Sequence, residues 1–245
     1  MRRKIAGVIM SVILLGAIGL LLKFMLIDAP KKEAESRDLG EAYQKAYQKA
    51  NQAVKLQRNG DLFKAAENYV ESAEKLMSAL KYNRKDPKAP AVRKKMIDYY
   101  EKGVALFIQD ALRQPTDRTV KVAYIFDGDT VKLEDNEKVR YLGIDTPEVS
   151  HKPGEKDEPF GKEATRANSL MVENKYVQLK YDKEKKGTYE RTLAYVFYGN
   201  LFVNAELVRR GLAQYYSPAG SPLKYKKLFL ACEALAKENK AGMWR

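Results

Sequence analysis

Three short segments of this 245-residue chain combine acidic residues with isolated arginines. The first contains Asp127-Gly-Asp129, the second runs from Arg140 to Glu148, and the third contains Arg191. Carboxylate oxygens bind hard divalent cations such as Ca²⁺, and the guanidinium group of arginine clamps a phosphate with a rigid fork of donors. Together these residue types indicate metal-assisted cleavage of a phosphodiester bond.

Each segment taken alone has a simpler interpretation. Asp-Gly-Asp is a common turn, because Asp and Gly both form turns readily. Asp145-Thr-Pro-Glu148 suits a loop, since Pro147 holds the residue before it in an extended conformation. Arg140 alternates with apolar residues, as a solvent-facing position of a strand does. The chemical interpretation therefore depends on the three segments occurring together.

Their order and spacing resemble the staphylococcal nuclease (thermonuclease) family. That family's pattern is D-G-D-T, then R-x4-D-T/A-P-E, then Y-x-R-x-L-A-Y, and the chain matches each part. The resemblance extends from about Asp117 to Trp244 and includes Phe160-Gly-Lys-Glu-Ala-Thr165 and Asn204-Ala-Glu-Leu-Val-Arg-Arg-Gly-Leu-Ala213. It implies an OB-fold barrel and an enzyme that hydrolyses nucleic acid.

The resemblance also implies a Ca²⁺ cofactor. The carboxylates of Asp129 and Asp145 and the backbone carbonyl of Thr146 are expected to bind the ion, with Asp127 behind them. All are hard oxygen donors, which Ca²⁺ prefers. They are too few for a closed cage, so water and substrate phosphate are expected to complete the coordination.

The catalytic roles follow from the same resemblance. Glu148 is expected to orient or deprotonate the attacking water, and Arg140 and Arg191 to grip the phosphate as its charge develops. Aromatic rings are expected to meet a terminal phosphate or stack on a base; the candidates are Tyr189 and one of Tyr215 and Tyr216. The segment 183–188 lacks the acidic–basic pair that some family members carry before this tyrosine.

The expected reaction is Ca²⁺-dependent endonucleolytic cleavage of single-stranded DNA and RNA, leaving 3′-phosphates by resemblance. Two alternatives differ in class: a non-catalytic OB-fold module that only binds nucleic acid, and a membrane-tethered scaffold that acts through a helical bundle, with cleavage incidental. Degenerate nuclease domains lose the carboxylates or arginines, whereas this chain keeps them all. The net charge of +13 suits a polyanionic partner without identifying it.

The N-terminal segment is predicted to be a transmembrane anchor, residues 1–27. An uncharged, mostly apolar run from Ile5 to Leu22 is followed by Lys23 and a further apolar stretch to Ile27, long enough to span a bilayer. A cleavable signal peptide is the alternative, but no small-residue cleavage site follows. Basic residues 2–4 favour a cytoplasmic N-terminus. We therefore expect a single-pass membrane protein, inserted through residues 5–27, with its nuclease domain extracytoplasmic.

After a linker at 28–35, residues 36–113 are predicted to form a three-helix bundle. Apolar residues recur at helical spacing, Asn59-Gly-Asp61 breaks the first helix, and Asp61 is expected to cap the second. The bundle resembles a microtubule-interacting-and-trafficking (MIT) domain at Ala50-Asn-Gln-Ala53 and at Tyr69 to Ala73. It is either a spacer between membrane and enzyme or a module that binds a protein partner.

From residue 117 to 245 the pattern changes to short strands with interspersed helices. Five strands with Asp-Gly and Gly-Asn turns suit an OB-fold barrel, and Asn204 and Ser221 are plausible helix N-caps. Cys232, the only cysteine, is expected to be a buried small hydrophobe, and His151, the only histidine, a loop residue. The predicted fold class is therefore α+β: a transmembrane helix, a three-helix bundle and a barrel of the staphylococcal nuclease type.

Overall fold

A computed structural model describes residues 38–150, 154, 156–183, 185–186, 191–217 and 223–245. No helix among these residues is long and apolar enough to cross a membrane. The predicted anchor at 1–27 and the linker at 28–35 lie outside the described residues, as do His151, Tyr189 and Ser221. Those assignments therefore stay predictions.

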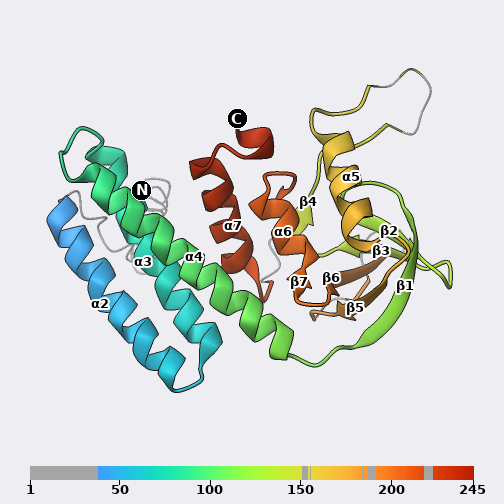
Figure 1. Cartoon of the computed structure of the whole chain (residues 1–245), viewed down its shortest axis with the longest axis horizontal. Helices are drawn as coiled ribbons and strands as arrows, with labels where there is room; N and C mark the ends of the chain where they lie inside the picture. The colour runs from blue at the N-terminus through green and yellow to red at the C-terminus, as the bar shows by residue number, and fades with distance from the viewer. Residues whose placement is uncertain (1–37, 151–153, 155, 184, 187–190, 218–222) are drawn as a thin grey trace, which may run out of the picture.

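The N-terminal part of the described chain consists of three long helices, as predicted: α2 (Leu39–Arg58), α3 (Leu62–Tyr82) and α4 (Ala89–Arg113). Helix α3 packs against both α2 and α4 (Figure 1). Asp61 caps α3, since its side chain accepts a hydrogen bond from the Lys64 N–H at 3.2 Å. Small residues such as Ala46, Ala66 and Ala73 are fully buried and let the helices approach closely.

The C-terminal part is built on a closed five-stranded barrel. Its strands are β1 (Arg118–Ile125), β2 (Thr130–Leu133), β3 (Lys138–Tyr141), β5 (Tyr176–Lys180) and β6 (Thr192–Tyr198). Antiparallel pairs run β3-β2-β1-β5-β6, and a parallel pairing of β3 with β6 joins the two ends. The closure removes free sheet edges and is consistent with the predicted OB-like fold.

Short strands and helices complete this part: β4 (Ile144–Asp145), α5 (Gly161–Val172), β7 (Leu201–Phe202), α6 (Val203–Arg209), β8 (Gln214–Tyr215), α7 (Lys226–Glu238) and the 3₁₀ helix η3 (Gly242–Trp244). The mixed helix-and-sheet architecture confirms the predicted α+β class. The apolar run from Val139 to Ile144 is divided between β3 and β4, because Gly143 takes a positive φ of 83° between them.

One predicted helix cap is wrong. Helix α6 begins at Val203, after Phe202, so Asn204 lies inside it. The Asn204 side chain is fully buried, accepts a hydrogen bond from the Val196 N–H at 2.9 Å, and donates one to the Leu142 carbonyl at 2.9 Å. A buried amide needs partners, and tertiary contacts rather than the helix terminus supply them here.

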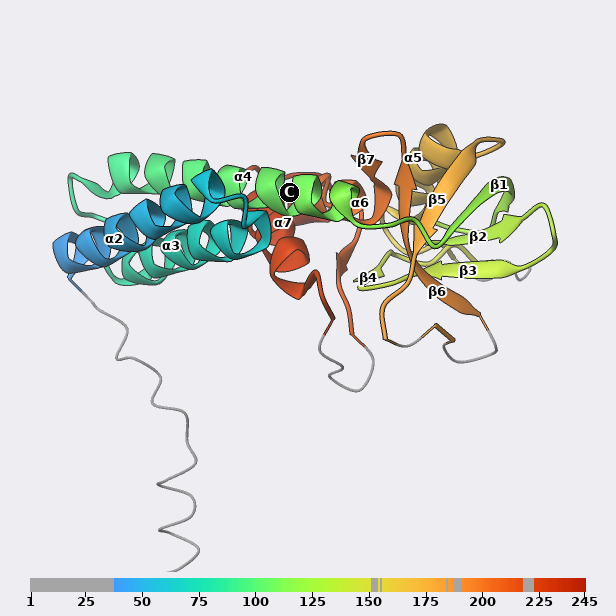
Figure 2. The ribbon, with the colours of Figure 1, turned by 90° about the horizontal axis from the view of Figure 1, so that it is seen from below.

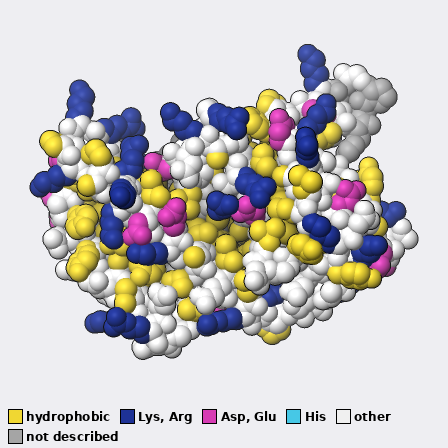
Figure 3. Space-filling model, in the orientation of Figure 1, with side chains coloured by type: hydrophobic (Ala, Val, Ile, Leu, Met, Phe, Trp, Pro, Cys, Tyr) yellow, Lys and Arg dark blue, Asp and Glu magenta, His cyan; other side chains and the backbone are white. Residues whose placement is uncertain are grey.

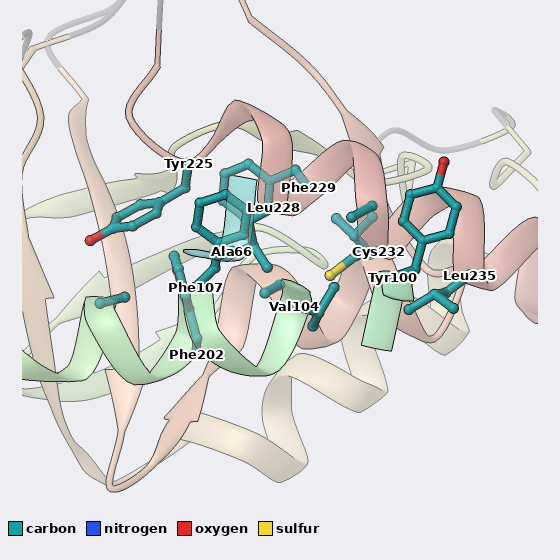
Figure 4. Packing of buried hydrophobic residues seen from close by; sticks show 14 of the residues in the cluster. Ala66, Tyr100, Val104, Phe107, Phe202, Tyr225, Leu228, Phe229, Cys232 and Leu235 are labelled. Atoms are coloured by element: carbon teal, nitrogen blue, oxygen red, sulfur yellow. The ribbon is translucent and has the colours of Figure 1, made fainter. Parts of the chain in front are cut away.

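The bundle and the barrel share one hydrophobic core. Helix α7 lies between them and packs against α4 (Figures 1 and 2). Phe107 of α4 lies edge-on to Phe63 at 5.1 Å, and Phe63 contacts Tyr225, just before α7, at 6.4 Å. Figure 4 shows Phe107 and Val104 of α4 beside Leu228 and the buried Cys232 of α7. The prediction for Cys232 is confirmed.

Polar contacts reinforce this junction. Lys227 of α7 donates to Glu71 of α3 at 2.8 Å and lies 3.3 Å from Glu67, while Glu71 also pairs with Lys49 of α2 at 2.7 Å. The Lys180 ammonium, at the end of β5, donates to carbonyls in the last turn of α4. These contacts hold the bundle against the barrel. Elsewhere, cationic side chains are scattered over the face shown in Figure 3.

Candidate active site

The Asp-Gly-Asp segment forms a tight turn between β1 and β2. The Asp127 side chain accepts a hydrogen bond from the Asp129 N–H at 2.9 Å. Gly128 is required by packing rather than by backbone conformation, because a Cβ there would lie only 2.7 Å from Ala164 Cβ and from Thr146 Oγ1. The turn therefore brings Asp129 against the Thr146 loop, 17 residues further along the chain.

Asp129 is a fully buried carboxylate. Its Oδ2 accepts hydrogen bonds from the Thr146 N–H at 2.9 Å and the Thr146 hydroxyl at 3.1 Å, and its Oδ1 accepts one from the Thr130 hydroxyl at 3.1 Å. A buried charge needs such partners to offset its lost hydration. These contacts fix the direction in which Oδ1 points.

Arg140 lies between two of the predicted metal ligands. Its side chain extends from β3, where it pairs in register with Thr130 of β2. The guanidinium forms ion pairs with Oδ1 of Asp129 and Oδ1 of Asp145. Two carboxylate oxygens from separate segments of the chain therefore reach a single cationic group.

Glu148 lies at the mouth of this cluster on an exposed loop. Partial desolvation and the neighbouring charge of Asp127 raise the pKa of its carboxyl, and Arg140 partly offsets the rise. The loop is held by Glu158, whose carboxylate accepts from the Glu148 N–H at 3.0 Å while its own N–H donates to the Glu148 carbonyl at 2.9 Å. A carboxylate of raised pKa is a stronger base than an ordinary one.

Strand pairing brings the predicted tyrosines close to the cluster. In the β4–β8 pair Asp145 is opposite Gln214 and Ile144 is opposite Tyr215, and the Tyr216 N–H donates to the Gly143 carbonyl at 3.1 Å. A cavity of about 400 Å³ opens beside them, lined by Asp145, Thr146, Pro147, Glu158, Phe160 and Gln214 among others. Space for a ligand is thus adjacent to the carboxylates.

Arg191 lies immediately before β6, the strand that pairs with β3 in parallel. Its neighbours Thr192 and Leu193 are opposite Val139 and Arg140, so Arg191 enters the strand next to the one that carries Arg140. The structure thus brings together Asp127, Asp129, Arg140, Asp145, Thr146 and Glu148, with Arg191 one strand away. Tyr189 lies outside the described residues.

Three residues that support the cluster were not predicted from the sequence. Asn168 of α5 donates to the Asp127 carbonyl at 3.1 Å and accepts from the Tyr141 hydroxyl at 2.8 Å. The other two are Thr130, which bonds Asp129, and Glu158, which holds the Glu148 loop. The position of Asn168 on the apolar face of its helix was the only available signal, because a buried amide there requires a polar partner.

The donor chemistry of the cluster fits Ca²⁺. The described residues contain no group of three or more His, Cys, Asp or Glu side chains arranged as a metal site. The proposed Ca²⁺ ligands include only two carboxylates, those of Asp129 and Asp145, together with the Thr146 carbonyl. Such a site needs water and substrate to complete the coordination of the ion. Carboxylates also outnumber cations at Arg140, since its guanidinium pairs with both Asp129 and Asp145 and lies near Glu148. An additional positive ion would relieve that imbalance.

The chain is similar in sequence to known nucleases. A family model described as staphylococcal nuclease homologue matches residues 138–245. The chain is 35% identical over 143 residues to a thermonuclease of Staphylococcus hyicus, spanning 56% of this chain and 82% of that protein. It is 36% identical over 128 residues to a thermonuclease of Staphylococcus intermedius, spanning 50% and 74%. The chain belongs to the staphylococcal nuclease family. It is also 37% identical over 122 residues to endonuclease YncB of Bacillus subtilis, spanning 48% and 57%.

Membership confirms the resemblance derived from sequence and identifies the chain as a nuclease, a hydrolase that acts on nucleic acid. The family match begins at Lys138 in β3, so it includes Arg140, Glu148 and Arg191 but not the turn that carries Asp129. In this nuclease the contact between Asp129 and Thr146 joins that turn to the matched region.

Proposed function

We propose that this nuclease is a membrane-anchored, Ca²⁺-dependent endonuclease that cleaves single-stranded DNA and RNA and leaves 3′-phosphates. The observation that carries the proposal is the convergence of Asp129 Oδ1 and Asp145 Oδ1 on one cationic position, with Glu148 at its edge. The product chemistry and the Ca²⁺ requirement also draw on the family to which the chain belongs.

Asp129, Asp145 and the Thr146 carbonyl would hold the ion. When bound, Ca²⁺ supplies positive charge that neutralises the phosphoryl oxygens of the substrate. Asp129 is already desolvated and held by Thr146 and Thr130, so little reorganisation of this ligand is needed. Asp127 would support the site indirectly. Its side chain accepts a hydrogen bond from the Asp129 N–H and so holds the turn that carries Asp129.

Arg140 has two roles in this proposal. Without the cation its guanidinium offsets the charge of Asp129 and Asp145. With the cation present, those carboxylates have another partner, and the guanidinium is available to a phosphate oxygen beside them. Arg191, on the neighbouring strand, would provide a second fork of donors. Both would interact most strongly as charge develops in the transition state.

Glu148 would position and deprotonate the water that attacks the phosphorus atom. The Glu148 carboxylate lies near Asp127, Asp145 and Arg140. It is therefore close to a proposed cation ligand, Asp145, and to Arg140, the proposed hydrogen-bond donor to the phosphate. The water oxygen bonds to phosphorus and gives its proton to the Glu148 carboxylate. The bond from phosphorus to the 5′-oxygen breaks, and that oxygen takes a proton from solvent, giving a 3′-phosphate and a 5′-hydroxyl. Tyr215 and Tyr216, beside Asp145, are candidates for contact with the substrate, as is Tyr189 by resemblance.

The membrane part of the proposal rests on sequence. Residues 5–27 are mostly apolar and uncharged apart from Lys23, and residues 2–4 carry three positive charges on the proposed cytoplasmic side. This orientation puts the nuclease domain outside the cytoplasm, where millimolar Ca²⁺ would fill a weak site. Protease added to intact cells is expected to remove the nuclease domain. Protection of the domain, or release of a protein that starts near residue 28, would contradict the anchor or its orientation.

Cleavage itself is tested with the full-length protein in detergent. Labelled single-stranded DNA and RNA should be cut internally when Ca²⁺ is present and remain intact when a chelator is added. Treatment of the products with a 3′-phosphatase should change their mobility. A folded protein that binds the strands but cuts neither at millimolar Ca²⁺ would favour the alternative, a non-catalytic nucleic-acid-binding or scaffold protein.

The bundle offers a second binding role. A hollow of about 740 Å³ lies between α2 and α4, with Leu39, Tyr43 and Val92 among its apolar residues and four lysines against one aspartate around it. Charge complementarity favours an acidic amphipathic peptide as its protein partner. Such a peptide should bind the wild type more tightly than Lys88→Glu, with Lys55→Glu on the exposed surface of α2 as a control. Equal affinity for all three would leave the bundle as a spacer.

A further inference from the structure

Aromatic and basic side chains form a strip on the outer face of the first three barrel strands. Its members are Tyr124 of β1, Phe126 just after β1, Lys132 of β2 and Lys138 of β3, and we refer to them as the aromatic strip. Strand register puts Tyr124 opposite Lys132 and Lys132 opposite Lys138. The four residues therefore lie side by side although the segment that contains them is interrupted by two turns.

The rings of the strip are arranged for contact with a ligand rather than for burial. Tyr124 is 51% exposed. Its ring meets that of Phe126 at 5.2 Å and 80°, and the Lys138 ammonium lies 4.6 Å from the Phe126 centroid. An exposed tyrosine held in place by a second ring loses little conformational freedom when a flat group stacks on it. Every nucleobase presents such a flat face.

The strip is continuous with the active site. Lys138 and Arg140 are two residues apart on β3, so their side chains lie on the same face, about 7 Å apart along the strand. On the neighbouring strand Thr130, which is opposite Arg140, bonds Asp129. Phe126 directly precedes Asp127. A strand held at Arg140 would thus run onto the aromatic strip.

The charges around the strip favour a polyanion. Among the described residues neither Lys132 nor Lys138 forms an ion pair with a carboxylate, whereas Asp135 and Glu137 in the adjoining turn are paired with Arg118. Glu134 in that turn is exposed, but its carboxylate accepts a long hydrogen bond from the Lys121 N–H. Two lysines are therefore available for phosphates.

We propose that the aromatic strip binds the single-stranded stretch of substrate next to the scissile phosphate, with a base stacked on Tyr124 and phosphates on Lys132 and Lys138. The proposal rests on the proposed function, because it extends the same substrate beyond Arg140. Binding at the strip would make the enzyme prefer strands of several nucleotides over a dinucleotide. It would also favour single strands over duplex, because the bases of a duplex are already stacked on one another.

The test compares substrates of different length on the full-length protein. For Tyr124→Ala, the ratio of the KM for a twelve-nucleotide oligothymidylate to the KM for dithymidylate should rise about tenfold relative to the wild type, the effect of losing one stacked base. Tyr47→Ala, which removes a similarly exposed ring from α2, is the matched control and should leave the ratio at the wild-type value. A ratio that is the same in Tyr124→Ala and in the control would overturn the proposal.

Binding is measured separately from cleavage, so that failure of the strip and failure of the proposed function can be distinguished. Fluorescence anisotropy with labelled oligothymidylate and Ca²⁺ gives Kd as a function of salt. Lys132→Gln and Lys138→Gln should each reduce the slope of log Kd against log salt by about one. If the wild type does not cleave the strands but the two variants still bind them more weakly than the wild type does, the nuclease mechanism alone is refuted. An active wild type whose salt slope is unaltered in both variants refutes the strip alone.

Discussion

Lys180 should be the side chain on which the junction between bundle and barrel depends most. It is 5% exposed at the end of β5. Its ammonium donates to the carbonyls of Ala111 and Gln114 at 2.7 Å each and to that of Leu112 at 3.4 Å. The last carbonyls of a helix have no partners within the helix, so Lys180 satisfies the C-terminus of α4 from another part of the fold.

Lys180→Met removes the donor and keeps most of the packing of the side-chain stem. Two close acceptors each lose a hydrogen bond from a charged donor, which contributes about 1.5–3 kcal/mol. The Ala111 carbonyl keeps its bond from the Gln114 N–H at 3.3 Å, and the 3.4 Å contact adds little. Relief of the desolvation of the ammonium, which lowers the pKa of Lys180, offsets part of the loss. We therefore expect the free energy of unfolding to fall by about 2–4 kcal/mol, which lowers Tm by roughly 5–15 °C for a chain of this size.

Urea unfolding followed by circular dichroism measures the change. Lys183→Met is the matched control, because Lys183 is exposed three residues away, and it should alter stability by less than about 0.5 kcal/mol. If Lys180→Met behaves like this control, water has replaced the ammonium at the α4 terminus and the reasoning fails. Nuclease activity per folded molecule should not change, since the active site lies on other strands.

Three further predictions concern catalysis, the interhelical ion pairs and the shared core. Glu148→Gln and Arg191→Ala should each lower kcat by about 10²-fold while Tm stays within a few degrees, and near-normal turnover would remove that residue from the site. Burial alone would raise the pKa of Glu71, but its two lysine partners hold the pKa below the usual value. Its stabilising effect is thus present at neutral pH and lost in acid. The difference in unfolding free energy between wild type and Glu71→Gln, about 0.5–1 kcal/mol, should therefore shrink as pH falls from about 6 to about 3, and a constant difference would argue against the ion pairs. Phe107→Ala should cost about 3–5 kcal/mol and shift the loss of helical signal and the loss of activity together, whereas two separate transitions would mean that the bundle and barrel do not share a core.

The local features of this protein follow from its sequence. Apolar spacing predicted the three helices of the bundle, and Asp61 was recognised as a cap because the cap hydrogen bond spans only three residues. The same holds for the Asp-Gly-Asp turn, whose hydrogen bond from the Asp129 N–H to the Asp127 side chain spans two residues. The residue types at Asp129 and Glu148 indicated a phosphodiesterase because the chemistry needs carboxylates and arginines together.

Only the tertiary structure decided how these pieces face one another. Periodicity shows which side of α4 and α7 is apolar, but not that the two sides cover each other. Nor does it show that β3 pairs in parallel with β6, that Arg140 bridges Asp129 and Asp145, or that Asn204 and Lys180 satisfy distant carbonyls. These contacts join residues that are far apart in the chain. Their free energies depend on which buried polar groups and apolar faces meet when the whole chain packs. The local sequence around each residue does not determine those long-range partners.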